Sequence, residues 1–476
     1  MAILSRLQKW SLDKVGAPGT LRGQLSQILA QFLGEGVGAR ARRSAVWSVI
    51  DFGCGQALRL ASNLVLTRLL FPEAFGLMAL VSVILAGLTL FSDTGVGPLI
   101  GQSPRGDDPD FLNTAWTVAI FRGLLLWLMT LGLAMPVAAL YGAPLLAQML
   151  PVVGLTLLID GFRPTAVHTV HRHLALGRLI RIKLSTQVIS LVVMTLLAWW
   201  LESVWALVVG SVIGNLLTAI AYHLFLPGIR NRFRFERESA GEIFHFGKWI
   251  FLSTAAGFLV NQGDRAILGL YVSLEALGIY NIGYFLASIP LLLSRSLQQI
   301  VMPPLYRMKP PADSVENRLA IFRARRLIAL SMLSFTGLLS FLGPSLVDFL
   351  YDARYASAGV MITLFSLSII PSISLNTIAA ALIGVGDTRA LFIVNSVTAL
   401  TQTLILIFGI SSYGIVGALV SPGLAVLAAY PISLFYSLRY RVFDPVQDFA
   451  ITLFGFLFPI FACLMYRREI LALFVQ

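Results

Sequence analysis

The sequence predicts an all-α polytopic membrane protein in which twelve core transmembrane helices form two six-helix lobes. Composition is the first observation: the 476 residues are 57% hydrophobic and 12% charged, with a mean hydropathy of +0.83. Soluble domains carry roughly 25% charged residues, so this chain lacks the polar surface that water requires. The other two observations are apolar spans of bilayer length and an internal repeat.

Composition also excludes several classes of function. The net charge is +12, but the basic residues lie between apolar spans rather than on a folded soluble module, so nucleic-acid binding is not expected. Cys54 and Cys463 both fall inside apolar spans and form no C-x-x-C motif. His168, His171 and His173 lack a cysteine or carboxylate to complete a metal site. No metal, cofactor or enzymatic activity is predicted.

Each predicted helix rests on an apolar span of about 20 residues, the length that crosses a bilayer. Such spans must be helical, because unpaired backbone groups cannot face lipid. The first six spans are Ala45 to Leu70, Phe75 to Gly101, Thr114 to Tyr141, Pro144 to Val167, Leu184 to Leu201 and Val204 to Leu226. The next six are Trp249 to Tyr271, Leu277 to Val301, Leu327 to Leu350, Gly359 to Val385, Ala390 to Ile410 and Gly414 to Leu438. A shorter apolar run, Phe449 to Tyr466, predicts a thirteenth helix.

The remaining segments complete the domain organisation. Before the first span, apolar residues at helical spacing predict an amphipathic helix on the membrane surface: Leu21, Leu25, Ile28, Leu29, Phe32 and Leu33. We therefore divide the chain into a cytoplasmic amphipathic segment (1–44), an N-lobe (45–226), a basic cytoplasmic linker (227–248), a C-lobe (249–441) and a C-terminal segment with the thirteenth helix (442–476).

Lysine and arginine predict the orientation, since basic residues near span ends resist translocation. With a cytoplasmic N-terminus, the odd-numbered connections carry only Arg68 and Arg354. The tail and the even-numbered connections carry the rest, among them Arg40, Arg42, Arg43, Arg172, Arg178, Arg181, Lys183, Arg230, Arg232, Arg234, Arg237, Lys248, Arg307, Lys309, Arg318, Arg323, Arg325 and Arg326. This asymmetry predicts a cytoplasmic N-terminus. Arg467 and Arg468 alone oppose it, because a thirteenth crossing would place them outside.

An internal repeat appears at an offset of 202 residues. Trp47 then falls on Trp249 and Gly76 on Gly278, so Pro-Glu-Ala-Phe-Gly-Leu corresponds to Leu-Glu-Ala-Leu-Gly-Ile. An even number of crossings per half preserves orientation. The halves are therefore predicted to be parallel repeats around an axis along the membrane normal, with a central cavity between them.

Charged residues inside the spans are candidates for function, because each costs roughly 2.5 to 3.5 kcal/mol at a helix centre. On the first helix, Asp51, Gly55, Arg59 and Asn63 advance by four and form one polar stripe. On the seventh helix, Asn261, Asp264 and Arg265 share a face, and we expect the two stripes to face each other across the cavity. The alternative is that such groups, for example Asp160 with Arg163, are ion pairs that lock one conformation.

Several motifs resemble a known family. Leu-Thr-Arg-Leu-Leu-Phe-Pro-Glu-Ala-Phe-Gly-Leu (66–77), Ser-Asp-Thr-Gly-Val-Gly (92–97) and Leu-Asn-Thr-Ala-Trp (112–116) resemble the opening of bacterial Wzx-type polysaccharide-transport flippases. Asp-Arg-Ala-Ile-Leu-Gly (264–269) and Leu-Gly-Ile-Tyr-Asn (277–281) are similar to the start of that family's second half. The resemblance covers roughly 40–440. This sequence departs from the family pattern in two ways. Its N-terminal extension before Arg40 is long, and no apolar span corresponds to a fourteenth helix.

The resemblance implies the fold of the multidrug, oligosaccharidyl-lipid and polysaccharide exporter superfamily. It also implies a flippase that moves undecaprenyl-pyrophosphate-linked oligosaccharide units by alternating access, for exopolysaccharide, capsule or O-antigen synthesis. Its partners would be this substrate, membrane lipids and other polysaccharide-assembly proteins. Cationic side chains would offset the desolvation of the pyrophosphate. The substrate-binding candidates are Arg59, Arg122, Arg265, Arg295, Asn63 and Asn261, and the candidates for ion coupling or gating are Asp51, Asp93, Asp160 and Asp264.

Two other functions stay open. A cation-coupled multidrug exporter of the same fold would favour an acidic cavity, whereas arginine outnumbers aspartate by five to four inside the spans. A membrane glycan polymerase or ligase would need a large external catalytic loop. No odd-numbered connection is longer than about ten residues between the hydropathy boundaries.

Overall fold

The computed structural model describes residues 36–308, 313–375, 382, 387–441 and 444–473, and within these ranges every regular element is a helix. The predicted N-terminal amphipathic helix lies outside them. In order, the helices are α3 (Val37–Leu69), α4 (Pro72–Leu90), α5 (Val96–Gln102), α6 (Pro109–Leu140), α7 (Leu146–Gly161), α8 (Ala166–Arg172), α9 (Leu176–Leu201), α10 (Trp205–Phe225), α11 (Arg237–Leu268), α12 (Leu274–Ala287), α13 (Ile289–Met308), α14 (Val315–Leu350), η1 (Ala353–Tyr355), α15 (Ala356–Ser374), α17 (Thr388–Arg439), α18 (Pro445–Met465) and α19 (Arg467–Ala472).

The all-helical membrane fold is confirmed. Among the described residues, and with α17 counted once, eight helices are long and apolar enough to cross a bilayer, or up to ten if α7 with α8 and α12 with α13 each form one bent span. The count of twelve core crossings stays a prediction. The second predicted span is shorter than expected, because the chain leaves the helix after Leu90 and turns through Gly95, whose φ of 64° is left-handed.

The long helix α17 contains two antiparallel helices rather than one rod. Gly414 interrupts it with φ 58° and ψ −142°, values that glycine adopts without strain. On either side of this break, a Cβ on Gly417 would lie 2.0 Å from the carbonyl oxygen of Gly409, so the two backbones are in direct contact. Farther along, Thr401 Oγ1 donates a 3.5 Å hydrogen bond to the carbonyl of Ala425. The chain therefore reverses at Gly414, where the sequence separates two predicted spans.

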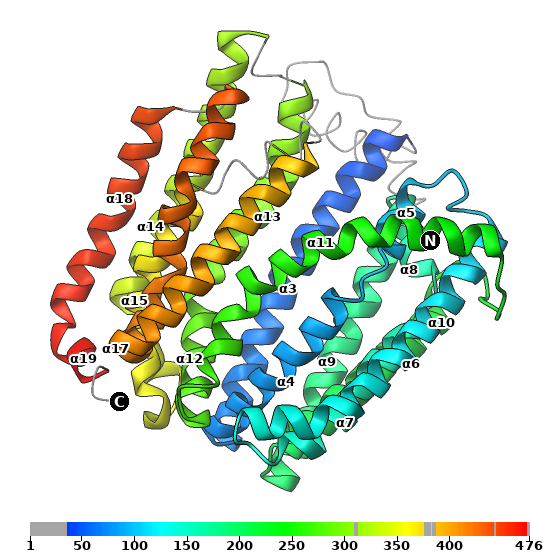
Figure 1. Ribbon diagram of the computed structural model, residues 1–476, viewed down its shortest axis with the longest axis horizontal. Helices are drawn as coiled ribbons and strands as arrows, with labels where there is room; N and C mark the ends of the chain where they lie inside the picture. The colour runs from blue at the N-terminus through cyan, green and yellow to red at the C-terminus, as the bar shows by residue number, and fades with distance from the viewer. Residues whose placement is uncertain (1–35, 309–312, 376–381, 383–386, 442–443, 474–476) are drawn as a thin grey trace, which may run out of the picture.

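The helices form two groups, with α4 to α10 on one side and α12 to α19 on the other (Figure 1). Helix α11 starts beside α5 and crosses to the middle of the molecule, where α12 follows it (Figure 1). Its first turns pack with the N-terminal group, because Ile243 lies in one buried cluster with Leu99, Phe111 and Ala115. The connection between the groups is therefore part of the N-terminal group's packing.

At one end of the molecule the two groups meet through α4 and α12, the helices that carry the repeated motif. A Cβ on Gly76 would lie 2.0 Å from the carbonyl oxygen of Leu274, and a Cβ on Gly278 would lie 2.0 Å from that of Pro72. These two contacts are related by the same 202-residue offset as the sequence motif. The repeated glycines thus permit the two copies of the motif to cross with their backbones in contact, and we refer to this contact as the glycine crossing.

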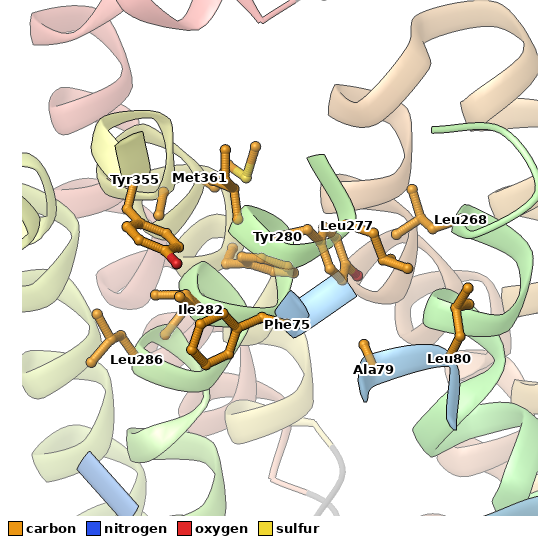
Figure 2. Close-up of a cluster of buried hydrophobic side chains, with 14 of the residues drawn as sticks. Phe75, Ala79, Leu80, Leu268, Leu277, Tyr280, Ile282, Leu286, Tyr355 and Met361 are labelled. Carbon is orange, nitrogen blue, oxygen red and sulfur yellow. The ribbon is translucent and has the colours of Figure 1, made fainter. Parts of the chain in front are cut away.

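Aromatic rings, and hydrogen bonds from tyrosine hydroxyls to backbone carbonyls, surround the glycine crossing. Figure 2 shows Phe75 near Tyr355, and their ring centroids lie 6.3 Å apart in an edge-to-face arrangement. The hydroxyl of Tyr355 donates to the carbonyl of Leu70 at 3.4 Å, so the C-terminal group contacts the end of α3. In the other direction, the hydroxyl of Tyr141 donates to the carbonyl of Ala266 near the end of α11 at 3.0 Å. Tyr355 of the C-terminal group therefore contacts the end of α3, and Tyr141 of the N-terminal group contacts the end of α11.

The predicted thirteenth helix is present as α18, which has 21 residues and passes the length and composition criteria for a span. It packs on α14 and α15 through glycines: a Cβ on Gly455 would lie 2.9 Å from Ile370, and one on Gly337 would lie 2.9 Å from Phe458. A buried ion pair, Arg325 with Asp448 at 2.7 Å, joins α14 to α18. Helix α18 is thus an integral part of the C-terminal group.

Candidate functional site

The candidate site is a cavity of about 560 Å³ between the two groups, away from the glycine crossing. Helices α3 and α9 form one wall and α13 forms the other. The N-terminal wall consists of Ser48, Val49, Asp51, Phe52, Gly55, Gln56, Arg59, Lys183 and Gln187, and the C-terminal wall consists of Leu292, Leu293, Ser296, Leu297, Gln299 and Ile300. One wall is therefore charged, and the other is apolar with neutral polar groups.

The charged wall comes from the polar stripe that the sequence predicts on the first helix. Asp51, Gly55 and Arg59 all line the cavity, since residues four apart share one face of α3. Asp51 accepts a 2.8 Å hydrogen bond from Lys183 Nζ, and this ion pair ties α3 to α9. The exposed Arg59 has no ion pair or side-chain hydrogen bond to any described residue. The described lining thus carries one uncompensated positive charge.

The predicted polar face of α11 lies elsewhere. In the described part of the chain, the wall opposite Arg59 comes from α13 and not from Asn261, Asp264 or Arg265. Arg265 lines neither this cavity nor the smaller one described next. Its guanidinium lies 4.4 Å from the ring centroid of Tyr284 and donates to Gln262 Oε1 at 3.1 Å. Among the described side chains, the polar stripes of α3 and α11 therefore do not face each other across one cavity, as we expected them to do.

Asn261 and Asp264 line a smaller cavity of about 60 Å³ inside the C-terminal group. Asp264 is 4% exposed; its Oδ2 accepts a 2.9 Å hydrogen bond from the hydroxyl of Tyr280, while Oδ1 has no hydrogen-bond partner. Arg295, which also lines this cavity, donates to Asn261 Oδ1 at 3.2 Å. An ionised carboxylate with an unsatisfied oxygen is costly to bury, so Asp264 stands out among the residues that line this cavity.

The other predicted site residues make contacts within the N-terminal group. Arg122 donates to Ser92 Oγ at 3.0 Å and to the carbonyl of Thr89 at 2.8 Å, which joins α6 to the end of α4. Asp93 accepts from the amide of Gly95 at 2.9 Å and so stabilises the turn before α5. Asp160 pairs with Arg163 at 2.7 Å, as the ion-pair alternative expects. Asn63, farther along α3, is not among the residues that line either cavity.

Sequence reasoning missed Lys183, Gln187 and the wall from α13. Helix α9 begins at Leu176, eight residues before the predicted span, so Lys183 is a helical residue that faces α3 rather than a loop residue. The signal for this is the spacing of Lys183 and Gln187, which are four apart and share a helix face. No comparable charge marks the α13 residues that line this cavity, which are all neutral.

Comparisons with known proteins agree with this architecture. A family model described as "Polysaccharide biosynthesis protein" matches residues 65–360. The teichuronic acid biosynthesis protein TuaB of Bacillus subtilis is 20% identical over 325 residues, which cover 68% of this chain and 66% of TuaB, just under two thirds of that relative's length. The succinoglycan biosynthesis transport protein ExoT of Rhizobium meliloti is 23% identical over 384 residues, which cover 79% of this chain and 76% of ExoT.

Solved structures show the same fold. An inward-closed structure of the lipid II flippase MurJ matches with a TM-score of 0.62 at 16% identity, over 89% of this chain and 99% of MurJ. An inward-facing multidrug resistance transporter of the MATE family, in the MOP superfamily, matches with a TM-score of 0.63 at 13% identity, over 81% of this chain and 94% of that one. The chain therefore has the fold that these two membrane proteins share. Because the family model spans more than half of its length, the chain belongs to the polysaccharide biosynthesis protein family.

Proposed function

We propose that this protein is a flippase that moves undecaprenyl-pyrophosphate-linked oligosaccharide repeat units across the bacterial inner membrane for exopolysaccharide, capsule or O-antigen synthesis. The observation that carries the proposal is the cavity between the two groups, with Arg59 uncompensated on its wall. The names of TuaB and ExoT and the fold shared with MurJ support it. It acts as a transporter and catalyses no covalent step.

The geometry supports transport by alternating access. We infer that the cavity opens toward the end where α3 begins, because the glycine crossing lies at the other end. The positive-inside rule assigns the end where α3 begins to the cytoplasm. The other end is closed by the glycine crossing. A head group would enter from the cytoplasm, and a rocking motion that separates α4 from α12 would release it outside.

The lining residues suit a pyrophosphate with attached sugars. Arg59 offers a planar guanidinium that can donate two parallel hydrogen bonds to phosphate oxygens. Gln187, Ser296 and Gln299 offer neutral donors and acceptors for sugar hydroxyls. A cavity of this size is within the usual range of about 300 to 1,000 Å³ for small-molecule sites.

Asp264 is our candidate for coupling transport to a proton or a cation, because its carboxylate is buried with one oxygen unsatisfied. Asp51 is the candidate for gating, since its ion pair with Lys183 holds the cavity wall together. Arg295 and Asn261 would serve the smaller cavity rather than the pyrophosphate.

The alternatives receive less support. A multidrug exporter for cationic drugs would favour a negative cavity, whereas the described lining of this one has a net positive charge. A polymerase or ligase would need a large catalytic loop, and the described connections near the glycine crossing are short turns, such as those after Leu69 and after Leu268.

Replacing Arg59 tests the proposed function. Arg59→Gln is expected to lower transport of a fluorescent lipid-linked oligosaccharide in proteoliposomes roughly 10- to 100-fold, because a charge-assisted hydrogen bond contributes about 1.5 to 3 kcal/mol. Arg59→Lys should retain part of the activity, since a point charge still attracts phosphate. Arg68→Gln is the matched control, because Arg68 is an exposed residue of the same helix outside the cavity. Normal transport by Arg59→Gln would refute the assignment of the pyrophosphate to this wall.

The proposed orientation is tested by cysteine labelling. In a protein without Cys54 and Cys463, a cysteine at the exposed position 237 should be protected from a membrane-impermeant maleimide in intact spheroplasts. A cysteine at Tyr413, which is exposed beside the reversal at Gly414, should react. The opposite pattern would invert the topology and place the cavity opening outside.

A further inference from the structure

The segment between α10 and α11 is an extended strap, Arg230–Glu236, that lies along the start of α6. The backbone amides of alternate strap residues donate hydrogen bonds to side chains of α6. These bonds run from Arg232 to Asn113 Oδ1 (2.9 Å), from Arg234 to Thr117 Oγ1 (3.1 Å) and from Glu236 to Thr114 Oγ1 (3.1 Å). Polar side chains of α6 thus satisfy the strap's amides as a neighbouring β-strand would.

Side chains fix the strap further. Arg234 pairs with Asp110 at 2.7 Å, and Glu236 accepts from Arg105 at 2.7 Å. The ring of Phe233 lies 5.1 Å from that of Trp116, centroid to centroid. Hydrogen bonds from Ser239 and Arg105 hold the pKa of the Glu236 carboxyl below its ordinary value. The strap is therefore a fixed part of the N-terminal group.

The position of α6 in the bilayer indicates the depth at which the strap lies. Lipid-facing apolar residues of this helix begin at Phe121 and continue to Leu140, about 30 Å at 1.5 Å per residue, which is the thickness of the hydrocarbon core. Before Phe121 the large apolar side chains of α6 are buried, namely Phe111, Leu112, Trp116, Val118 and Ile120. The strap thus lies beside the turns of α6 that fall within the headgroup region.

The side chains that the strap presents at this depth match a lipid interface. Phe233 and Phe235 are 66% and 63% exposed. Arg230 and Arg232 are exposed and have no ion pair or side-chain hydrogen bond with any residue that the structure describes. The acidic residues that flank them are engaged, Asp110 by Arg234 and Glu236 by Arg105. Aromatic rings favour the headgroup level, and nearby arginines attract anionic lipids.

We propose that the strap is a binding site for the phosphate of anionic phospholipids in the leaflet next to the cavity opening, with Arg230 and Arg232 as ligands and Phe235 inserted between acyl chains. This site is separate from the substrate cavity. It attaches the N-terminal group to the leaflet, so that rocking moves the C-terminal group relative to it.

Native mass spectrometry of the purified full-length protein in detergent tests the site, with phosphatidylglycerol as the probe and phosphatidylcholine as its neutral counterpart. The wild type should bind phosphatidylglycerol in preference to phosphatidylcholine. Arg230→Gln/Arg232→Gln should weaken phosphatidylglycerol binding roughly 30-fold, since each arginine near a membrane surface contributes about fivefold. Arg230→Lys/Arg232→Lys should retain most of it.

The matched control removes the same charge from the other group: Arg323→Gln/Arg326→Gln, two exposed arginines of α14. It should leave the strongest phosphatidylglycerol adduct unchanged. An equal loss in this control, or no preference for phosphatidylglycerol in the wild type, would overturn the proposal. If the strap variant keeps its phosphatidylglycerol affinity but binds a lipid-linked oligosaccharide more weakly, the strap belongs to the substrate path instead. Phe235→Ser, which leaves both arginines in place, should weaken adducts of long-chain more than of short-chain phosphatidylglycerol.

Discussion

Gly76→Ala is expected to abolish transport while the protein still reaches the membrane. A Cβ at this position would lie 2.0 Å from the carbonyl oxygen of Leu274, a distance that real Cβ atoms essentially never show. Backbone cannot yield as a flexible side chain can, so α4 and α12 would have to separate. Because these helices belong to different groups, this separation would keep the two groups apart at the glycine crossing, the end of the molecule away from the cavity.

The test combines transport with a measure of closure. In the wild type the Arg354 guanidinium reaches the carbonyl of Thr67 at 3.4 Å. Cysteines introduced at these two positions should therefore be cross-linked readily by a bifunctional maleimide about as long as an arginine side chain in the parent, and poorly beside Gly76→Ala. Gly278→Ala should behave in the same way, since its Cβ would meet the carbonyl of Pro72 at the same distance. Gly132→Ala is the control, because apart from the neighbouring backbone of its own helix no described atom lies within 4 Å of its Cβ position. Normal transport by Gly76→Ala would show that the glycine crossing is not needed for the cycle.

The glycine crossing also shows how much of the fold the sequence predicts. The two motifs are visible as a repeat at 202 residues, and α4 and α12 begin at Pro72 and Leu274, at that offset. Spans, helical class and the thirteenth helix follow from hydropathy because lipid forces each apolar run into a helix. That the two motifs touch each other could not be predicted, since contact between repeats depends on how the groups are rotated.

The candidate site was predictable only where one helix determines it. Asp51 and Arg59 lie on one wall because a spacing of four fixes a shared face. The same reasoning could not show that Arg59 lines the large cavity while Arg122 and Arg265 do not. All three are arginines inside spans, but Arg122 meets carbonyl and hydroxyl groups of α4, and Arg265 meets the ring of Tyr284. Whether a buried charge is satisfied locally depends on neighbouring helices, which the sequence of its own helix does not reveal.

Asp448→Ala is expected to destabilise the attachment of α18 by about 3 kcal/mol, the lower end of the cost of breaking a buried ion pair. Asp448 is buried on α18 and accepts a 2.7 Å hydrogen bond from the buried Arg325 on α14. The substitution leaves that guanidinium without its carboxylate at a site from which water is excluded. The midpoint of thermal unfolding in detergent should fall, and protease should cleave the chain before Pro445 more readily. Glu469→Ala, which removes an exposed carboxylate beyond α18, should change neither.

A second variant separates the charge from the packing. Arg325→Leu/Asp448→Leu removes both charges and should recover most of the stability, because well-packed apolar residues often replace a buried ion pair at little cost. Glycine contacts at Gly455 and Gly337 still hold α18 against its neighbours in this variant, so the helix should stay attached. If the double variant is as unstable as Asp448→Ala, the ion pair itself stabilises the attachment and apolar packing cannot substitute for it. If Asp448→Ala unfolds like the wild type, the attachment of α18 rests on the glycine contacts alone.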